Sequence, residues 1–416
     1  MTPILVIGGG IAGLTAAVEL ADAGCEVILV EKSPTLGGRV ARMHQYFPKL
    51  CPPACGLELL FRRIRDLRSI TVHTLAEVEG IAGTPGDYNV TVRINPRYVD
   101  ESCTVCGDCS KACTAERDDD FNYGLTRTKA AYLPAATAYP ARHVIDRAAC
   151  PNGCHACVEA CTYKSINLDQ QVERKQLKVS SVVAATGWEP YDATRIDNLG
   201  FGRCANVVTN VLLERMAATD GPTSGKILRP SDGKEPRTVA FVQCAGSRDE
   251  NHLPYCSAVC CAASIKHAAY IRALYPETAI TVFYIDLRTP GRIEEFQSQV
   301  VEEANVRLVK GKVAQVDENP GTRDVSVTVE DALSGRKQKL NFELVVLATG
   351  IVPRTDGLPP GFARDEFGFI NGPNGKSGLY AAGCVHRPAE VSASVQDATG
   401  AALKAFQCAN RSAAHA

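Results

Sequence analysis

The residues of this chain that could most readily do chemistry are its cysteines. The 416 residues include 18 cysteines, and most of them fall in three short windows. In a reducing compartment, cysteines gathered in this way more often bind metal or do redox work than form disulfides. The first window reads CTVCGDCSKAC, with the spacing C-x2-C-x2-C-x3-C over Cys103, Cys106, Cys109 and Cys113. This spacing is typical of thiolates that hold a [4Fe–4S] cluster.

The second window, CPNGCHACVEAC, repeats this pattern with a first gap that is one residue longer. In two-cluster ferredoxins, the fourth cysteine of each run binds the other cluster. Threonine replaces the proline that usually follows the fourth cysteine, and a zinc site is the alternative because thiolates also bind zinc. We expect one [4Fe–4S] cluster on Cys103, Cys106, Cys109 and Cys161, and another on Cys150, Cys154, Cys157 and Cys113.

The third window lies in residues 240–271, which read as a buried strand, a long turn and a helix. Its cysteines, Cys244, Cys256, Cys260 and Cys261, supply enough thiolates for one more [4Fe–4S] cluster. Adjacent helical residues point in different directions, so Cys260 and Cys261 could share a cluster only at an irregular first turn. A set of buried thiols around a tight turn is the alternative that the spacing leaves open.

The N-terminal segment, residues 4–31, reads strand, turn, helix, strand. Gly8, Gly10 and Gly13 have the spacing G-x-G-x-x-G, and Glu31 ends the second strand. In this motif, the first glycine permits a tight turn, the second lets the backbone approach a pyrophosphate, and the third lets helix and strand pack closely. The helix N-terminus then faces the phosphates, and the acidic residue accepts bonds from ribose hydroxyls. The segment therefore predicts a dinucleotide site.

FAD fits this site better than NAD does. Gly37 and Gly38 in LGGRV follow soon after Glu31, as is typical of FAD-binding proteins. Two strands end in Ala-Thr-Gly, at 185–187 and 348–350, as expected of two nucleotide-type domains. We expect FAD contacts from Gly8, Gly10, Gly13, Glu31, Lys32, Gly37, Gly38, Arg39, Thr186, Gly187, Gly350, Gly383, Cys384 and Gln396.

The C-terminal segment SGLYAAGCV, residues 377–385, precedes a helix of small residues. Flavoproteins of the glutathione and thioredoxin reductase type have a similar strand, glycine and helix. Such a helix N-terminus faces the flavin pyrimidine ring and favours negative charge there. Those flavoproteins usually have Asp after the glycine, where this chain has Cys384. The substitution puts the usual ribityl contact in doubt.

Two further cysteines, Cys51 and Cys55, stand in YFPKLCPPACGLE, where two prolines stiffen the loop between them. They could form a redox dithiol beside the flavin, add a ligand to a cluster, or have only a structural role. His252, His267 and His386 have no evident carboxylate partner in the sequence and are expected to be surface or core histidines. Trp188 is expected in the core.

These elements predict an α/β protein with two domains and an insert. The chain begins with the first part of the FAD domain, which is interrupted by an insert unlike its neighbours and then continues. A second dinucleotide-type domain follows, and the chain returns to the FAD domain through ELVVLATG. The loop 221–236 is a plausible hinge. The predicted ranges are 1–96 and 171–236 for the FAD domain, 97–170 for the two-cluster insert, 237–342 for the second domain, and 343–416 for the return.

Composition narrows the function classes. The formal net charge is -1, so no nucleic acid or acidic membrane surface is indicated as a partner. The longest apolar runs are strand-sized and shorter than the roughly 20 residues of a membrane helix. No basic segment precedes a signal-type apolar stretch at the N-terminus. We expect a cytoplasmic protein that does not insert into the membrane itself.

The glycine loop, the two-cluster insert and CAGSRDENHLPYCSAVCC together resemble the A subunits of heterodisulfide reductases. The resemblance implies a thioredoxin-reductase-like flavoprotein that binds FAD. It also implies an unusual [4Fe–4S] cluster at Cys244, Cys256, Cys260 and Cys261, and it accounts for the cysteine at position 384. A flavin-based electron-bifurcating subunit is one function that this resemblance suggests.

Other segments are similar to the A subunits of quinone-interacting membrane-bound oxidoreductases. They are EKSPTLGGRV, YFPKLCPPACGLE, TKAAYLP, ATGWEPYDATRIDNLGFG, IDLRTPGR and SVQDATGAALKA. This resemblance implies B and C partner subunits, of which C is membrane-bound, and a position at the inner face of the cytoplasmic membrane. It also implies electron transfer between menaquinol and adenylylsulfate (APS) reductase. An NAD(P)H-dependent disulfide reductase using Cys51 and Cys55 is a third hypothesis. The absence of a second glycine loop, in the second dinucleotide-type domain, argues against it.

Overall fold

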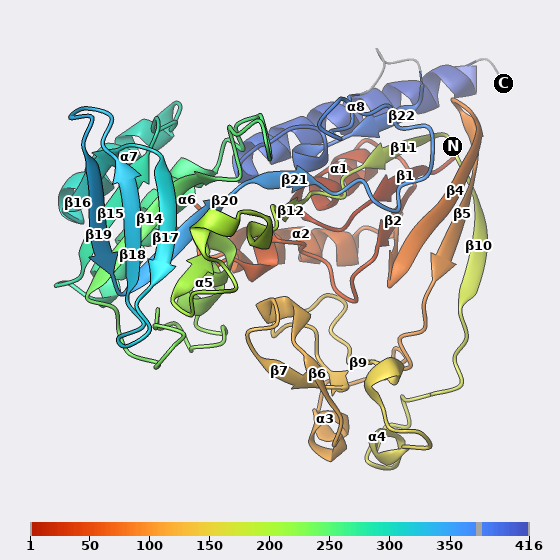
Figure 1. Ribbon diagram of the computed structural model, residues 1–416. Helices are drawn as coiled ribbons and strands as arrows, with labels where there is room; N and C mark the ends of the chain where they lie inside the picture. Colours follow the sequence, from red (N-terminus) through yellow and green to blue (C-terminus); the bar gives the residue numbers. More distant parts are fainter. Residues whose placement is uncertain (1, 372–376, 415–416) are drawn as a thin grey trace.

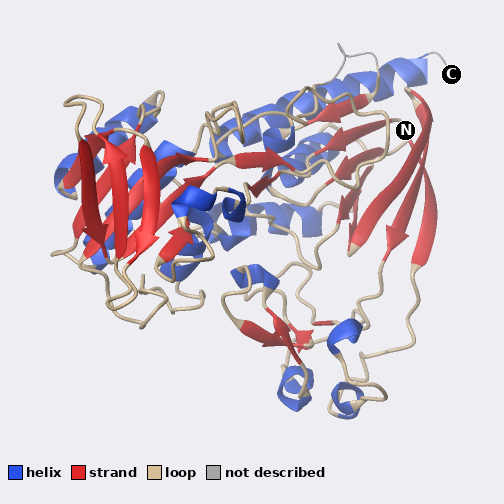
Figure 2. Ribbon diagram, in the orientation of Figure 1, coloured by secondary structure: helices blue, strands red, loops and turns tan. Residues whose placement is uncertain are grey.

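The computed structural model describes residues 2–371 and 377–414. Two α/β domains lie side by side, and a small module of short elements, which contains α3 (Asp108–Ala112) and α4 (Ala156–Glu159), lies below them (Figure 1). Figure 2 shows that this module consists mainly of loops, whereas the two domains are built on sheets covered by helices. None of the helices in the described ranges has both the length and the apolar character that a membrane crossing requires.

The first domain has a parallel sheet whose central strand, ILVI, is fully apolar and buried. Such a run is expected of a strand that is covered on both faces. One face packs on α1 and α8 through residues such as Ile4 and Val6, and the other on a second, antiparallel sheet through Leu5 and Ile7. The parallel sheet has the order β22 (Leu379–Ala381), β11 (Ser181–Ala184), β1 (Ile4–Ile7), β2 (Val27–Glu31) and β3 (Ile70–Thr74). The helices are α1 (Ile11–Asp22), α2 (Ala54–Asp66) and α8 (Val391–Ala414).

The insert leaves and re-enters the first domain at neighbouring strands. The antiparallel sheet has the order β10 (Glu173–Val179), β5 (Asp87–Ile94) and β4 (Ala76–Thr84). Ile94, which ends β5, pairs with Glu173, which begins β10. Residues 95–172 can therefore be added without disturbing the sheet, and the predicted insert, 97–170, lies within this range.

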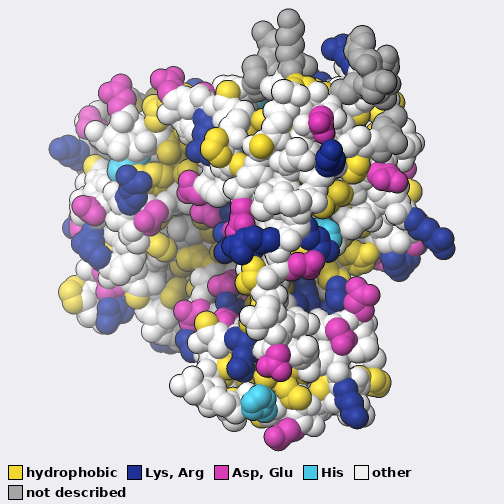
Figure 3. Space-filling model, turned by 90° about the vertical axis from the view of Figure 1, so that its right-hand side faces the viewer, with side chains coloured by type: hydrophobic (Ala, Val, Ile, Leu, Met, Phe, Trp, Pro, Cys, Tyr) yellow, Lys and Arg dark blue, Asp and Glu magenta, His cyan; other side chains and the backbone are white. Residues whose placement is uncertain are grey.

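The insert packs around its own cysteines. Cys109, Cys113 and Cys157 are buried together with Val99 and Ile145 in a small core. In the space-filling view, the insert forms a lobe at the bottom of the molecule, with basic and acidic side chains interspersed (Figure 3). Its elements are α3 (Asp108–Ala112), β6 (Glu116–Asp118), the short helix η2 (Asp120–Asn122), β7 (Arg127–Lys129), β8 (Ala131–Tyr132), β9 (Val144–Ile145) and α4 (Ala156–Glu159).

The second domain has a five-stranded parallel sheet with helices on one face and a three-stranded antiparallel sheet on the other. The parallel sheet has the order β13 (Val207–Thr209), β20 (Leu344–Thr349), β14 (Thr238–Ala245), β15 (Ala279–Tyr284) and β16 (Val306–Lys310). The helices are α5 (Asn210–Ala217), α6 (Cys260–Leu274) and α7 (Arg292–Glu303). The antiparallel strands are β17 (Val313–Glu318), β18 (Val325–Glu330) and β19 (Lys337–Phe342).

Strand pairing corrects the predicted limits of this domain. The strands β13 and β20, assigned from the sequence to the FAD domain, pair with each other in the second sheet. The domains are joined instead by a ribbon of β12 (Trp188–Pro190) and β21 (Ile351–Pro353). The loop 221–236 is not a hinge, because it connects α5 to β14 within the second domain and buries Ile227 there. A buried apolar strand fits either sheet equally well, so its pattern alone could not assign it.

Candidate functional site

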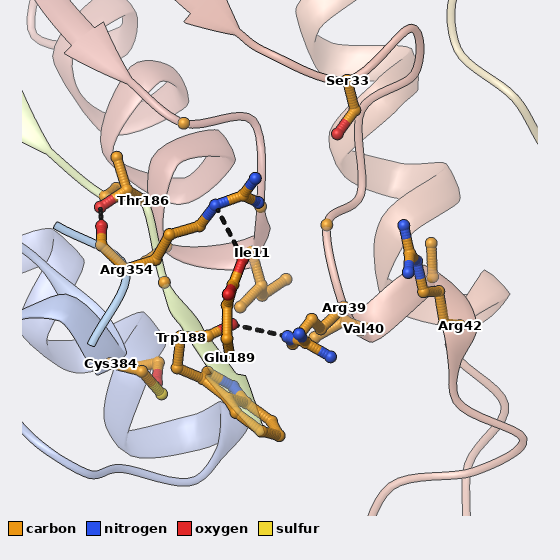
Figure 4. A pocket seen from close by; sticks show the side chains of 18 of the residues that line it. Ile11, Ser33, Arg39, Val40, Arg42, Thr186, Trp188, Glu189, Arg354 and Cys384 are labelled. Carbon is orange, nitrogen blue, oxygen red and sulfur yellow. Dashed lines mark hydrogen bonds and ion pairs between the residues drawn. The ribbon is translucent and has the colours of Figure 1, made fainter. Parts of the chain in front are cut away.

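A cavity of about 610 Å³ lies at the carboxyl ends of the strands of the first parallel sheet. This edge is where open α/β sheets bind their ligands. Figure 4 shows part of its lining, with Arg39, Trp188, Glu189 and Arg354 around the rim. The predicted FAD residues that line it are Gly8, Gly10, Glu31, Lys32, Gly38, Arg39, Thr186, Gly187 and Cys384.

The three glycines of the N-terminal motif have different roles in the structure. A Cβ on Gly8 would lie 2.4 Å from the Ala185 carbonyl oxygen, and one on Gly13 would lie 1.8 Å from the Gly8 carbonyl oxygen. A Cβ on Gly10 would meet only the Cα of Gly38, at 3.9 Å, and would project into the cavity that Gly10 lines. Gly8 and Gly13 thus permit close packing, whereas Gly10 leaves room for a ligand, as a pyrophosphate requires.

Glu31 ties the glycine turn to the end of β2. Its Oε2 accepts a hydrogen bond from Gly9 N at 2.5 Å, and its Oε1 accepts one from Ser33 N at 2.7 Å. A carboxylate has about four acceptor positions, so it can still accept hydrogen bonds from a ligand. Its place in the cavity lining fits the ribose-binding role that the sequence predicts.

Four other predicted FAD residues, apart from Gly13, lie outside the cavity lining. Gly350 directly follows β20 in the second domain, where a Cβ would lie 2.4 Å from Ser247 Oγ. Gln396 is on the exposed side of α8, since the helical period turns Ser394 toward the cavity instead. Gly37 packs against Ala41, and Gly383 donates its N–H to Asp397 at 2.8 Å. Their roles in the structure are therefore in packing and backbone geometry.

The insert and the second domain also reach this cavity, which the sequence did not predict. Phe121 and Tyr123 enter the lining from the insert, and Glu214, Lys266 and His267 enter it from α5 and α6. His267, expected to lack a carboxylate partner, lies with its Nε2 2.6 Å from Glu214 Oε2. No local pattern links two residues so far apart in the chain.

The charges of Glu214, Lys266 and His267 form a buried cluster. Lys266 Nζ lies 2.8 Å from Glu214 Oε2, and both side chains are almost fully buried. Burial opposes ionisation of Glu214, but Lys266 and His267 outweigh it and lower the pKa of the carboxyl group. Burial also lowers the pKa of His267, despite the opposing effect of Glu214. A neutral His267 with its proton on Nε2 would therefore donate to an ionised Glu214.

Trp188 lies at the cavity rim and not in the core as expected. The Arg39 guanidinium stacks on its ring at 4.5 Å, and Arg39 Nε donates to its carbonyl oxygen at 2.6 Å. Burial lowers the pKa of Arg39. Tyr123 of the insert also contacts Arg39, with its ring centroid 5.7 Å from the same guanidinium and its hydroxyl oxygen 3.1 Å from Arg39 Nη1. Arg39 therefore joins the FAD domain to the insert at the cavity.

One buried arginine, Arg215 of α5, contacts all three parts of the molecule. Its Nε and Nη2 donate to Asn122 Oδ1 of the insert at 3.0 and 2.8 Å. Its Nη1 donates to the Arg42 carbonyl oxygen of the FAD domain at 3.1 Å. Asp220 Oδ1 of the second domain lies 3.3 Å from Nη1. These contacts fix the insert and the second domain relative to the cavity.

The thiols of the insert lie in two groups, and the cluster ligands assigned by the exchange rule stay a prediction. The thiols of Cys150, Cys113 and Cys154 lie close enough to Cys157 to add to the effect of burial, which raises its pKa. Cys103 and Cys106 act in the same way on Cys109, whose pKa burial raises to about 11. Cys161 Sγ lies 3.2 Å from Ser165 Oγ. Within the described ranges, no three His, Cys, Asp or Glu side chains are arranged to hold a metal ion. A cubane offers each thiolate a separate iron, so its ligands stand farther apart than those of one ion.

The four cysteines of the third window line one small pocket. Cys260 and Cys261 open the regular helix α6, and the irregular backbone lies before it, where Ala258 has φ 62° and Cys244 has φ 56°, both in the left-handed region. Burial and the neighbouring thiols raise the pKa of Cys260 well above its usual value. Val259 and Ala263 of the same helical turn line the large cavity. The thiol pocket and the cavity therefore lie on either side of the start of α6.

Cys51 and Cys55 lie outside the cavity lining, although Tyr46 of the same loop is part of it. Cys55 is exposed and Cys51 is partly buried. Burial, followed by the two thiols, raises the pKa of Tyr46. A flavin-proximal dithiol thus stays a prediction, with Tyr46 between the thiols and the cavity.

Residues 6–62 match the family model of NAD(P)-binding Rossmann-like domains. The chain is 38% identical to the A subunit of the H2:CoB-CoM heterodisulfide,ferredoxin reductase of Methanothermobacter marburgensis, over 96% of this chain and 63% of the relative. It is also 38% identical to the iron-sulfur A subunit of the CoB-CoM heterodisulfide reductase of Methanocaldococcus jannaschii, over the same shares. The chain is therefore similar to heterodisulfide reductase A subunits over almost its whole length. It spans less than two thirds of the length of these homologues.

Solved structures confirm the predicted thioredoxin-reductase-like fold. The thioredoxin reductase of T. acidophilum has a TM-score of 0.53 at 15% identity, covering 97% of both chains. That of Lactococcus lactis has a TM-score of 0.55 at 14% identity, covering 99% of this chain and 100% of the other. At these identities the likeness extends to the fold alone, and it places this heterodisulfide reductase A homologue among two-domain α/β proteins.

Proposed function

We propose that this protein is an electron-transfer subunit of the heterodisulfide reductase type, which holds FAD and three [4Fe–4S] clusters. The observation that carries the proposal is the shared cavity. Side chains of the FAD domain, of the insert and of the second domain all line it. The predicted cluster ligands stand in the two modules that flank the FAD domain. One-electron carriers on two sides of a flavin are the arrangement that electron transfer needs.

FAD exchanges electrons in pairs or singly, and iron–sulfur clusters carry single electrons. The glycine turn and Glu31 would hold FAD at the cavity, as their geometry fits a dinucleotide. The twelve cysteines of the three windows would hold the clusters. In this mechanism no side chain acts as a nucleophile.

The residues around the cavity place charges in its lining, pair them with one another and cover the rim. Lys266 places a positive charge in the lining, which favours negative charge on a bound ligand. His267, as the neutral donor to Glu214, keeps that carboxylate paired away from water. Arg39, in contact with both Trp188 and Tyr123, covers the rim. Together these residues would exclude water from the site.

The names of the homologues suggest the partners. They include a CoB-CoM heterodisulfide, ferredoxin, and F420H2 in a Methanosarcina acetivorans relative that is 36% identical. A ferredoxin carries single electrons, whereas reduction of a disulfide takes two. A protein that stands between them must divide or combine electrons, and electron bifurcation at the flavin is the form of the proposal that these names favour.

A second candidate is the A subunit of a quinone-interacting membrane-bound oxidoreductase. Its support is the set of sequence segments that runs from EKSPTLGGRV to SVQDATGAALKA. The partners would then be the B and C subunits and APS reductase, with menaquinol at the membrane-bound C subunit, and the protein would lie at the inner face of the membrane. Purification from native membranes, with identification of the proteins that co-purify, distinguishes the two candidates. Co-purification of APS reductase and a membrane subunit favours this candidate, and co-purification of hydrogenase-type partners favours the first.

The third hypothesis, an NAD(P)H-dependent disulfide reductase, predicts rapid bleaching of the flavin by NADH. In the second domain, the position of a nucleotide-binding glycine turn is taken by Cys244 and the loop after it. We therefore expect slow or no bleaching.

Cofactor analysis of anaerobically purified protein tests the main proposal. Three cubanes predict about twelve irons per FAD, with the EPR signals of reduced [4Fe–4S] clusters. Fewer than about eight irons per flavin in fully loaded protein would contradict the two clusters of the insert. The variants Cys260→Ser and Cys157→Ser should each lose about four irons and keep FAD bound. Loss of FAD in both variants would show that the modules do not hold their cofactors separately.

A further inference from the structure

The thiol pocket of the third window has a charged wall. Besides Cys244, Cys256, Cys260 and Cys261, it is lined by Arg248, Asp286 and Arg288. Arg248 belongs to the same turn as Cys244, and Asp286 and Arg288 follow β15. Two arginines at one small thiol pocket are unexpected if the pocket holds only neutral thiols. They suit a group that carries negative charge.

Arg248 is fixed with one nitrogen directed away from its ion pair. Its Nη2 donates to Asp286 Oδ2 at 2.9 Å. Its Nη1 is buried and has no hydrogen-bond partner among the described residues. The guanidinium also lies within hydrogen-bonding reach of the Cys244 thiol, whose pKa burial raises to about 11 and Arg248 partly lowers. Arg248 has φ 56°, a strained conformation that a non-glycine residue adopts only where its surroundings hold it.

We propose that Arg248, held by Asp286, sets the reduction potential of the cluster on these four cysteines by donating from Nη1 to sulfur. The inference rests on the proposed function, because it requires a cluster at this site. Hydrogen bonds to sulfur and local charge both tune cluster potentials. Reduction adds one negative charge, and a guanidinium keeps its positive charge at any ordinary pH. Arg248 therefore stabilises the reduced form and raises the potential.

Arg288, on the same wall of the pocket, should affect the cluster potential less than Arg248. Its side chain is 52% exposed and lies 4.0 Å from Asp286, whereas that of Arg248 is 23% exposed and lies at 2.9 Å. Charges in contact with water are screened more strongly than buried ones. Arg288 should thus shift the potential in the same direction as Arg248, by a smaller amount.

The test is an EPR-monitored redox titration of the full chain with all its cofactors. In Arg248→Gln, we expect the ratio of oxidised to reduced cluster at a fixed ambient potential to rise about tenfold. For a one-electron couple this equals a fall of about 59 mV in midpoint potential. Arg248→Lys, which keeps the charge but loses the planar fork, should give a smaller fall. Arg307→Gln, at an exposed position of β16, removes a charge that does not line the pocket and should give no shift.

Iron analysis separates the two ways in which the experiment can fail. If the unmodified protein has about eight irons per FAD and loses none in Cys260→Ser, no cluster is present here, and the proposed function fails at this site. If the cluster is present and its potential in Arg248→Gln equals that in Arg307→Gln, the inference about Arg248 is overturned. Should Arg248→Gln assemble no cluster, Arg248→Lys and Arg288→Gln decide, and unchanged potentials in both overturn it.

Discussion

Two strand–turn–helix units of this molecule face the same cavity with different residues. In the first domain, β1 leads into α1 through Gly8, Gly9 and Gly10. In the second, β14 leads into α6 through residues 246–259, which with their flanks carry four cysteines. The short turn lets a ligand approach the backbone at Gly10, whereas the long turn surrounds a pocket of its own. Under the proposed function, the same fold unit would bind a dinucleotide where the turn is glycine and a cluster where it carries cysteines.

The difference shows that the chemistry of such a unit depends on its turn. Both strands are buried and both helices pack on their sheets. In the short turn, the position with a positive φ is Gly8, at 109°, and glycine adopts such a conformation at little cost. In the long turn, the non-glycine residues Cys244, Arg248 and Ala258 have positive φ, a kind of strain that is enriched at functional sites.

The largest expected effect is on the short turn. In Gly13→Ala, the new Cβ would lie 1.8 Å from the Gly8 carbonyl oxygen, so α1 must move away from β1. We expect nearly complete loss of FAD and destabilisation of at least about 3 kcal/mol. Flavin absorbance after gel filtration and urea unfolding measure these two effects. Gly80→Ala in β4, where a Cβ would meet nothing within 4 Å, is the control and should retain FAD. If iron is lost along with the flavin, the two units are not independent.

The next effect concerns the charge cluster that lies between the two units. Glu214→Gln leaves Lys266 buried without its carboxylate partner, which should cost about 3 to 5 kcal/mol of unfolding free energy. The double variant with Lys266→Met should recover part of this loss, because no unpaired charge remains. Glu295→Gln, at an exposed position of α7, is the matched control and should change stability little. Equal losses in the single and the double variant would show that the cluster is not held by charge pairing.

The sequence predicted the short turn better than the charge cluster of Glu214, Lys266 and His267. The reason is the distance along the chain between the residues that form each feature. The G-x-G-x-x-G spacing and the cysteine runs are local patterns, so Gly8, Gly10 and the thiol groups could be placed before the structure. Glu214 and His267 are brought together only by the packing of α5 on α6. The assignments of β20 and Gly350 failed because a buried strand carries no mark of the sheet that it joins.

A smaller effect is expected where the insert docks on the second domain. Asn122→Ala removes the acceptor of two hydrogen bonds from the buried Arg215, which should cost about 1.5 to 3 kcal/mol. The loss should be concentrated in the insert and α5, where hydrogen exchange would speed up, while the FAD domain keeps its protection. Asn341→Ala, at an exposed position of β19, serves as control. Uniform acceleration over the whole chain would contradict a local docking role.

The smallest effect is on pH dependence. Burial lowers the pKa of His267 in the folded state, so below its unfolded value of about 6.5 the unfolded chain binds the additional proton. Stability from this group is therefore complete above that pH and is lost as the pH falls, by about 1 kcal/mol between pH 7 and pH 5.5. In His267→Gln, the amide can still donate to Glu214 but does not titrate in this range, so the slope of unfolding free energy against pH should decrease. Equal slopes in both proteins would show that the pKa of His267 does not change on folding. A larger slope in His267→Gln would show that folded His267 is protonated, and the cluster between the two turns would then carry one more positive charge.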